Sequence, residues 1–189
     1  MMFQIKDYRP KFYSNCKDFM QKNHKLIHQL IGQNFEGVYW VWDKTNEIWI
    51  KEFPVILKLS GGYCTLCAHK HSDFSMGFNN IDLNEKIKSA KYAGSELVWK
   101  EYNTRLINKS KNKDIQAVEI VNFLPRFIND FPLYNKKEEN IIRKLGFLHG
   151  VGFNIDGKTM VISNGLDDNN IVFFDMDFPV YYTRIIINK

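Results

Sequence analysis

Turn signals divide the chain into short segments that are rich in aromatic and β-branched residues. Gly61-Gly62 and Asp156-Gly157 each separate two such segments, and both pairs favour tight hairpin turns because glycine accepts positive φ at little cost. Consecutive strands joined by tight turns pair antiparallel, whereas a parallel pair needs a long crossover. The pattern therefore predicts a mainly antiparallel β-sheet.

The composition supports a β-rich fold. Aromatic residues make up 15% of the chain, with fifteen Phe, nine Tyr and four Trp, and aromatic side chains favour half-buried pleated surfaces. The expected strands cover residues 35–43, 47–52, 54–59, 63–70, 74–81, 95–103, 117–124, 147–155, 158–164, 170–177 and 180–187.

Three segments have the periodicity and caps of helices. The first covers about residues 14–32, where Ser14 or Asn15 can cap an apolar stripe that ends at Gly32. Capping-box pairs predict two short helices, over 82–94 and 135–146. We expect one domain over residues 1–189, in which the helix at about 14–32 packs on a β-rich body at about 35–188. The fold class is α+β, mainly antiparallel β, with a curled or two-layer sheet.

Residues 64–71 concentrate cysteine and histidine in the sequence CTLCAHKH. Cys64 and Cys67 are three residues apart, so on a strand they point to opposite faces and cannot chelate one ion together. Cys67, His69 and His71 share a face, and with a carboxylate such as Asp73 they are the weak candidates for a metal site. We interpret the segment as a structural strand.

No other motif specifies a reaction. His24 and His28 have helical spacing, but Lys25 stands where a metalloprotease helix carries glutamate. No phosphate-binding loop or nucleophile elbow is visible, and we predict no catalytic residue and no cofactor.

Charge and targeting signals narrow the function classes. The net charge is +5, but the lysines are scattered, and the densest basic run, Lys109–Lys113, lacks aromatic neighbours for base stacking. The N-terminus lacks the pattern of a secretory signal, and no apolar run approaches the ~18 residues of a membrane span. Three cysteines do not make a disulfide framework. We expect a cytoplasmic protein without membrane contact, for which nucleic acid is a less favoured partner.

Several segments together resemble a family of small bacterial proteins with a Trp-rich opening hairpin. The resemblance covers about residues 38–175 and is carried by that hairpin and by Asp73–Ser75, Asn80–Asp82 and Asn164–Asn169. Some members of the family are candidate immunity proteins of polymorphic toxin systems. The resemblance therefore implies a cognate toxin or a neighbouring gene product as partner, and it assigns no catalytic residue.

These observations predict a non-enzymatic, cytoplasmic protein-binding module that neutralises a bacterial toxin. The alternatives are a metal-binding protein or enzyme that uses the Cys67, His69 and His71 face, and a single-stranded nucleic-acid binder. Exposed aromatic residues and loops carry recognition, so the expected contact residues are Tyr39, Trp40, Trp42, Trp49, Asn164, Asp167 and Asp168.

Overall fold

A computed structural model describes residues 5–6, 8–70, 73–123, 147–165, 169–174 and 182–188. The expected helix at 135–146 lies outside the described residues, as do His71, Asp167 and Asp168.

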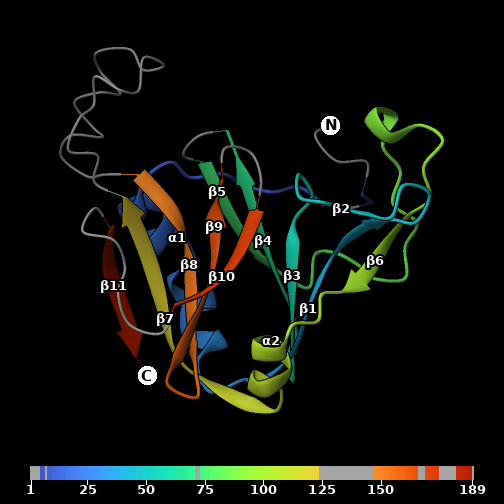
Figure 1. Cartoon of the computed structure of the whole chain (residues 1–189). Coiled ribbons are helices and arrows are strands. Elements are labelled where there is room, and N and C mark those ends of the chain that lie inside the picture. Colours follow the sequence, from blue (N-terminus) through green and yellow to red (C-terminus); the bar gives the residue numbers. More distant parts are fainter. Residues whose placement is uncertain are drawn as a thin grey trace, which may run out of the picture.

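The described residues form an antiparallel sheet of eleven strands (Figure 1). Its strands follow the order β10-β9-β8-β7-β1-β3-β4-β5, while β11 pairs with β7, and β2 and β6 pair with β1. The predicted class, mainly antiparallel β with few helices, is confirmed, and no strand pairing among the described residues joins the two ends of the sheet. The strand bounds are β1 Asn34–Asp43, β2 Ile48–Ile50, β3 Val55–Leu59, β4 Gly62–His69, β5 Asp73–Phe78, β6 Leu97–Glu101, β7 Lys113–Phe123, β8 Phe147–Ile155, β9 Lys158–Asn164, β10 Asn169–Phe174 and β11 Tyr182–Asn188.

The hairpins lie where the turn signals predict them. β3 pairs with β4 across Gly61-Gly62, and β8 pairs with β9 across Asp156-Gly157. At the second turn both residues have positive φ, 54° and 76°, which asparagine, aspartate and glycine tolerate best. β1 and β2 also pair as expected, with Trp42 opposite Trp49.

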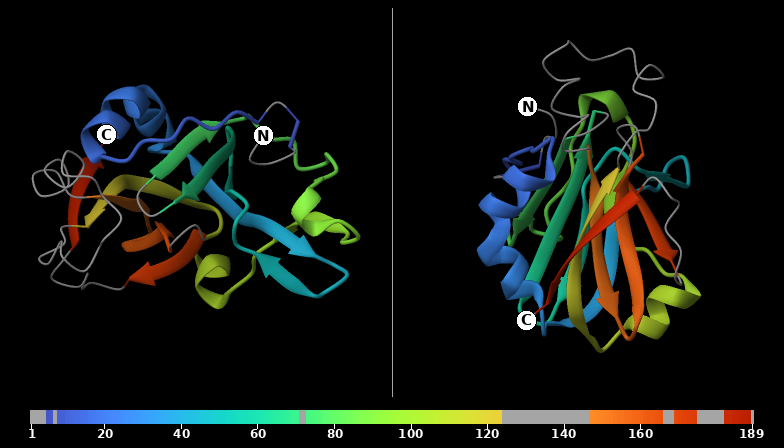
Figure 2. Two further views of the ribbon diagram at one scale, coloured as in Figure 1. Left: turned by 90° about the horizontal axis from the view of Figure 1, so that it is seen from above. Right: turned by 90° about the vertical axis from the view of Figure 1, so that its left-hand side faces the viewer.

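The sheet curls until its two ends meet, so that β4 contacts β9 and β5 contacts β8. Figure 2 shows this curl from above and from the side. Asn169 bridges the ends, because its Oδ1 accepts from Ala68 N at 2.9 Å and its Nδ2 donates to Phe53 O at 3.0 Å. The main core fills the inside of the curl, with Phe19, Phe35, Phe74 and Phe153 among its fully buried side chains.

A second core lies on the other face of the β1-β3-β4 part of the sheet. It joins residues from the N-terminal segment, from the strands and from the connection between β5 and β6. Its buried members are Ile5, Tyr8, Val41, Ile50, Phe53, Ile56, Cys67, Ile81, Ile87 and Leu97.

Helix α1 spans Cys16–Leu30 and packs beside β5, β7 and β11. Asn15 caps it by accepting from Asp18 N at 2.9 Å, and Gly32 follows with φ 86°. Its buried side includes Phe19, Ile27 and Leu30. In the part of the chain that the structure describes, no helix is both long and apolar enough to cross a membrane.

The helix predicted at 82–94 is wrong. Asp82 Oδ1 accepts from Asn84 N at 2.9 Å, which closes a side-chain turn that competes with helical hydrogen bonding. Only a short 3-10 turn, η1, follows at Ala90–Tyr92. Helix α2, Arg105–Ser110, was not expected; its cap Thr104 accepts from Ile107 N at 3.2 Å.

Candidate functional site

The strands β2 and β6 flank the second half of β1 and form with it a three-stranded ribbon at one side of the molecule (Figure 1). We call this part, residues 39–43, 48–50 and 97–101, the Trp ribbon. Trp42 pairs with Trp49 on one side and with Val98 on the other. Because directly opposed residues share a face, Trp40, Trp42, Trp49 and Lys100 project from one face of the ribbon.

That face carries a cluster of aromatic rings. The Trp42 and Trp49 rings meet edge to face with centroids 4.9 Å apart, and Tyr102 meets Trp49 in the same way at 5.1 Å. Lys100 Nζ lies 3.7 Å from the centroid of the Trp42 ring, a cation–π contact. Trp40 is only 3% exposed and belongs to the main core, so it anchors the ribbon while Trp42 and Trp49 stay half-buried at the surface.

The opposite face of the ribbon is covered. Val41 and Ile50 are buried in the second core, and Tyr39 and Trp99 pack against it half-buried. β1 therefore alternates as a strand does, with Trp40 and Trp42 on one face and Tyr39 and Val41 on the other. Of the four aromatic residues expected at the contact surface, Trp42 and Trp49 lie on the open face.

Of the other expected contact residues, Asn164 is the last residue of β9, while Asp167 and Asp168 lie outside the described residues. Asn164 is only 5% exposed and its Nδ2 donates to Asp73 O at 3.3 Å. Its partner in the β9–β10 pairing, Asn169, is fully buried. Both amides link the two ends of the curled sheet, and a buried amide offers no surface to a partner.

The cysteines of the CTLCAHKH segment lie in two separate cores. Cys64 belongs to the main core and Cys67 to the second, so they point to opposite faces of β4 as expected. Burial raises the pKa of each thiol to about 12, which disfavours the thiolate that binds metal or attacks a substrate. His69 lies half-buried with its ring 5.0 Å from that of Phe12. No three His, Cys, Asp or Glu side chains among the described residues are placed to hold one metal ion.

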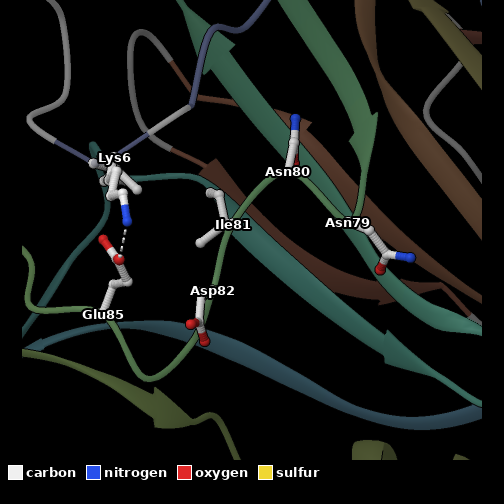
Figure 3. Close-up of a pocket in the computed structure, with 7 residues that line it drawn as sticks. Lys6, Asn79, Asn80, Ile81, Asp82 and Glu85 are labelled. Atoms are coloured by element: carbon white, nitrogen blue, oxygen red, sulfur yellow. Dashed lines mark hydrogen bonds and ion pairs between the residues drawn. The ribbon is translucent and has the colours of Figure 1, made fainter.

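A polar pocket of about 310 Å³ lies between the N-terminal segment and the chain that follows β5. Figure 3 shows Lys6 and Glu85 facing each other across it, with an ion pair of 3.2 Å. Asn79 accepts from Tyr63 N at 2.7 Å and Asn80 accepts from Thr65 Oγ1 at 2.7 Å. These amides fasten the segment to β4, so their polar atoms serve the fold.

Sequence reasoning missed a buried carboxylate on the sheet. Glu119 is 2% exposed; its Oε1 accepts from Thr159 Oγ1 at 2.9 Å and its Oε2 pairs with Arg184 at 3.2 Å. These contacts tie β7 to β9 and β11. The sequence signal for this buried carboxylate is a glutamate in the middle of an otherwise apolar strand.

No protein-family model, no curated protein and no solved structure was found to match this chain.

Proposed function

We propose that the protein is a non-enzymatic module that binds a protein partner through the aromatic face of the Trp ribbon. The observation that carries this proposal is the surface cluster of Trp42, Trp49 and Tyr102 with Lys100 stacked on Trp42. Tryptophan and tyrosine dominate binding energy at protein interfaces because they bury a large area with little loss of conformational freedom.

The position of the cluster also supports binding. The far face of the ribbon is packed on the second core and Trp40 is packed in the main core, so both anchor the strands that carry Trp42 and Trp49. A preorganised surface loses little conformational freedom on binding. The buried thiols of Cys64 and Cys67, in contrast, are poor nucleophiles because burial raises their pKa.

The partner class follows from the resemblance and from charge. The resembled family implies a bacterial toxin, which this protein would neutralise in the cytoplasm. Complementary charge steers protein association, and this chain has a net charge of +5. The toxin surface that meets the ribbon is therefore acidic around an apolar centre.

The test compares capture of a partner by three forms of the protein. Wild type and the double variant Trp42→Ala/Trp49→Ala serve as baits in native lysate, beside Ile186→Ala, which trims a 54% exposed apolar side chain on β11. Circular dichroism first establishes that all three are folded. We expect wild type and Ile186→Ala to recover the same protein in a 1:1 complex, and the double variant to bind it about 30-fold more weakly, the effect of losing a hot spot.

Two results would count against the proposal. One is that the double variant recovers the same proteins as wild type. The other is that an oligothymidine quenches Trp42 and Trp49 fluorescence with an affinity that falls steeply with salt, which would identify a single-strand nucleic-acid binder.

A further inference from the structure

A trough of about 610 Å³ runs between β6 and the segment at residues 83–88. One wall is made of five consecutive residues, 95–99, and the other of residues 83–88. Of these five, residues 97–99 belong to β6. Side chains of consecutive strand residues alternate between faces, yet all three border the trough. It therefore follows the edge of β6 for about 10 Å, at the usual rise of ~3.3 Å per residue.

The edge of β6 in this trough is open. β6 pairs only with β1 among the described residues. Lys44 N donates to Glu96 O at 2.9 Å and Tyr102 N donates to Val38 O at 2.8 Å. Hydrogen-bonded pairs alternate along an antiparallel ladder, so the backbone groups of Val98 face β1, as do those of Lys100.

The alternate residues, Leu97 and Trp99, direct their backbone N–H and C=O groups away from β1. Both residues line the trough, and no described residue bonds to these outward groups. An edge of this kind is a template for another strand.

Among the described residues, one buried donor beside the trough and part of its positive charge have no partner. Trp99 lines the trough, and its buried Nε1 has no hydrogen-bond acceptor among the described residues, which leaves an amide-like donor unsatisfied. Glu85 and Glu96 on its walls are neutralised by Lys6 and Lys44.

Lys86 and Lys88 also line the trough, and neither has an ion-pair partner among the described residues. Its floor is apolar, because Ile87 and Leu97 are buried there. The walls therefore combine uncompensated positive charge with apolar surface.

We propose that this trough receives an extended acidic segment of a protein, which adds as a strand to the edge of β6. The backbone of the segment pairs with Leu97 and Trp99, its apolar side chains lie over Ile87 and Leu97, and its carboxylates face Lys86 and Lys88. The inference rests on the proposed function and names the kind of segment that the partner presents beside the Trp ribbon.

The probe is a heptapeptide of alternating glutamate and valine with blocked ends, titrated into ¹⁵N-labelled protein. We expect saturable binding, slower hydrogen exchange at the Leu97 and Trp99 amides, and a shift of the Trp99 indole N–H signal. The amides of Val98 and Lys100 are already bonded to β1, so their exchange changes little. A peptide with lysine for glutamate, and one with proline for valine, should not bind, since the first reverses the charge and the second cannot form a strand.

Variants separate the trough from general charge attraction. Lys86→Glu/Lys88→Glu should weaken heptapeptide binding at least about tenfold. Lys22→Glu/Lys25→Glu makes the same charge change on the exposed side of α1 and should change the affinity less than about twofold, because distant surface charges are screened.

The inference is overturned if the heptapeptide does not bind, if the two lysine pairs weaken it equally, or if the Leu97 and Trp99 amides stay unprotected in the bound form. The two proposals can fail separately. Partner capture that depends on Trp42 and Trp49, without heptapeptide binding, leaves the proposed function standing and removes the strand addition. If the heptapeptide binds at Leu97 and Trp99 but capture of the partner does not depend on Trp42 and Trp49, the strand addition stands and the proposed function is removed.

Discussion

Asn169 holds the two ends of the curled sheet together, and its removal should cost much of the stability of the fold. In Asn169→Ala, Ala68 N loses its acceptor at 2.9 Å in a place where Asn169 is fully buried. An orphaned buried N–H costs about 1–3 kcal/mol. Phe53 O loses one of its donors, which costs less, because it still accepts a hydrogen bond from Trp40 Nε1 at 3.3 Å. With the small cavity added, we expect a loss of about 2–4 kcal/mol in the free energy of unfolding.

Urea denaturation followed by tryptophan fluorescence measures this loss, and Asn169→Asp tests its cause. At pH 7 a carboxylate would face Phe53 O, so Asn169→Asp should be less stable than Asn169→Ala. Burial raises the pKa of such an acid, so its penalty is present at high pH and falls as the pH drops through that raised pKa. At pH 5 the protonated acid can donate to Phe53 O and accept from Ala68 N. Asn169→Asp should then be the more stable of the two.

Asn108→Ala is the matched control, because Asn108 is exposed on α2 and surface changes of this kind stay within about 0.5 kcal/mol. If Asn169→Ala also stays within that range, or if the order of Asp and Ala variants does not reverse with pH, the side-chain bridge does not hold the sheet ends together.

Three further predictions follow from close packing and burial. Gly150→Ala places a Cβ 2.4 Å from Ile162 O, a backbone atom, so we expect a loss of about 2 kcal/mol or more by urea denaturation. Gly61→Ala meets only a flexible glutamine side chain and should cost less than half as much. Burial lowers the pKa of His149 to about 4, below its ordinary value of ~6.5, so stability is complete above pH 6.5 and falls by roughly 3 kcal/mol towards pH 4. His149→Gln should remove that part of the pH dependence. All three cysteines are buried, and burial raises the pKa of each to about 12, so a thiol reagent should modify them only after unfolding; fast modification of the native protein would contradict this.

Features set by neighbouring residues were predictable from the sequence. The hairpin turns, the alternation along β1 and the opposite orientation of Cys64 and Cys67 depend only on turn chemistry and on the two-residue period of a strand. The predicted helix at 82–94 failed for an equally local reason. Asp82 caps a turn, and tertiary contacts bury Ile87 without helical periodicity.

Features that depend on distant partners were not predictable. Asn169 bonds to residues 101 and 116 positions away, and within the sequence it belongs to a segment typical of a loop. Glu119 finds Arg184 at 65 positions. From the sequence alone, a polar residue in a loop-like segment or on an apolar strand could either stabilise the fold or bind a ligand. The pairing of the strands shows which contacts it makes. Of the seven expected contact residues, Trp40 and Asn164 are buried, Trp42 and Trp49 lie on the open face of the ribbon, and Asp167 and Asp168 lie outside the described residues.

The long strand β1 explains why the candidate surface can be separated from the fold. Its first half, with Phe35 and Val38, lies in the main core and pairs with β3. Its second half pairs with β2 and β6 and carries Trp42. Trp40 stands between the halves, buried, so the ribbon is fixed at its base. Trp49 and Tyr102 pack half-buried against the main core, whereas Trp42 belongs to neither core and lies on the open face.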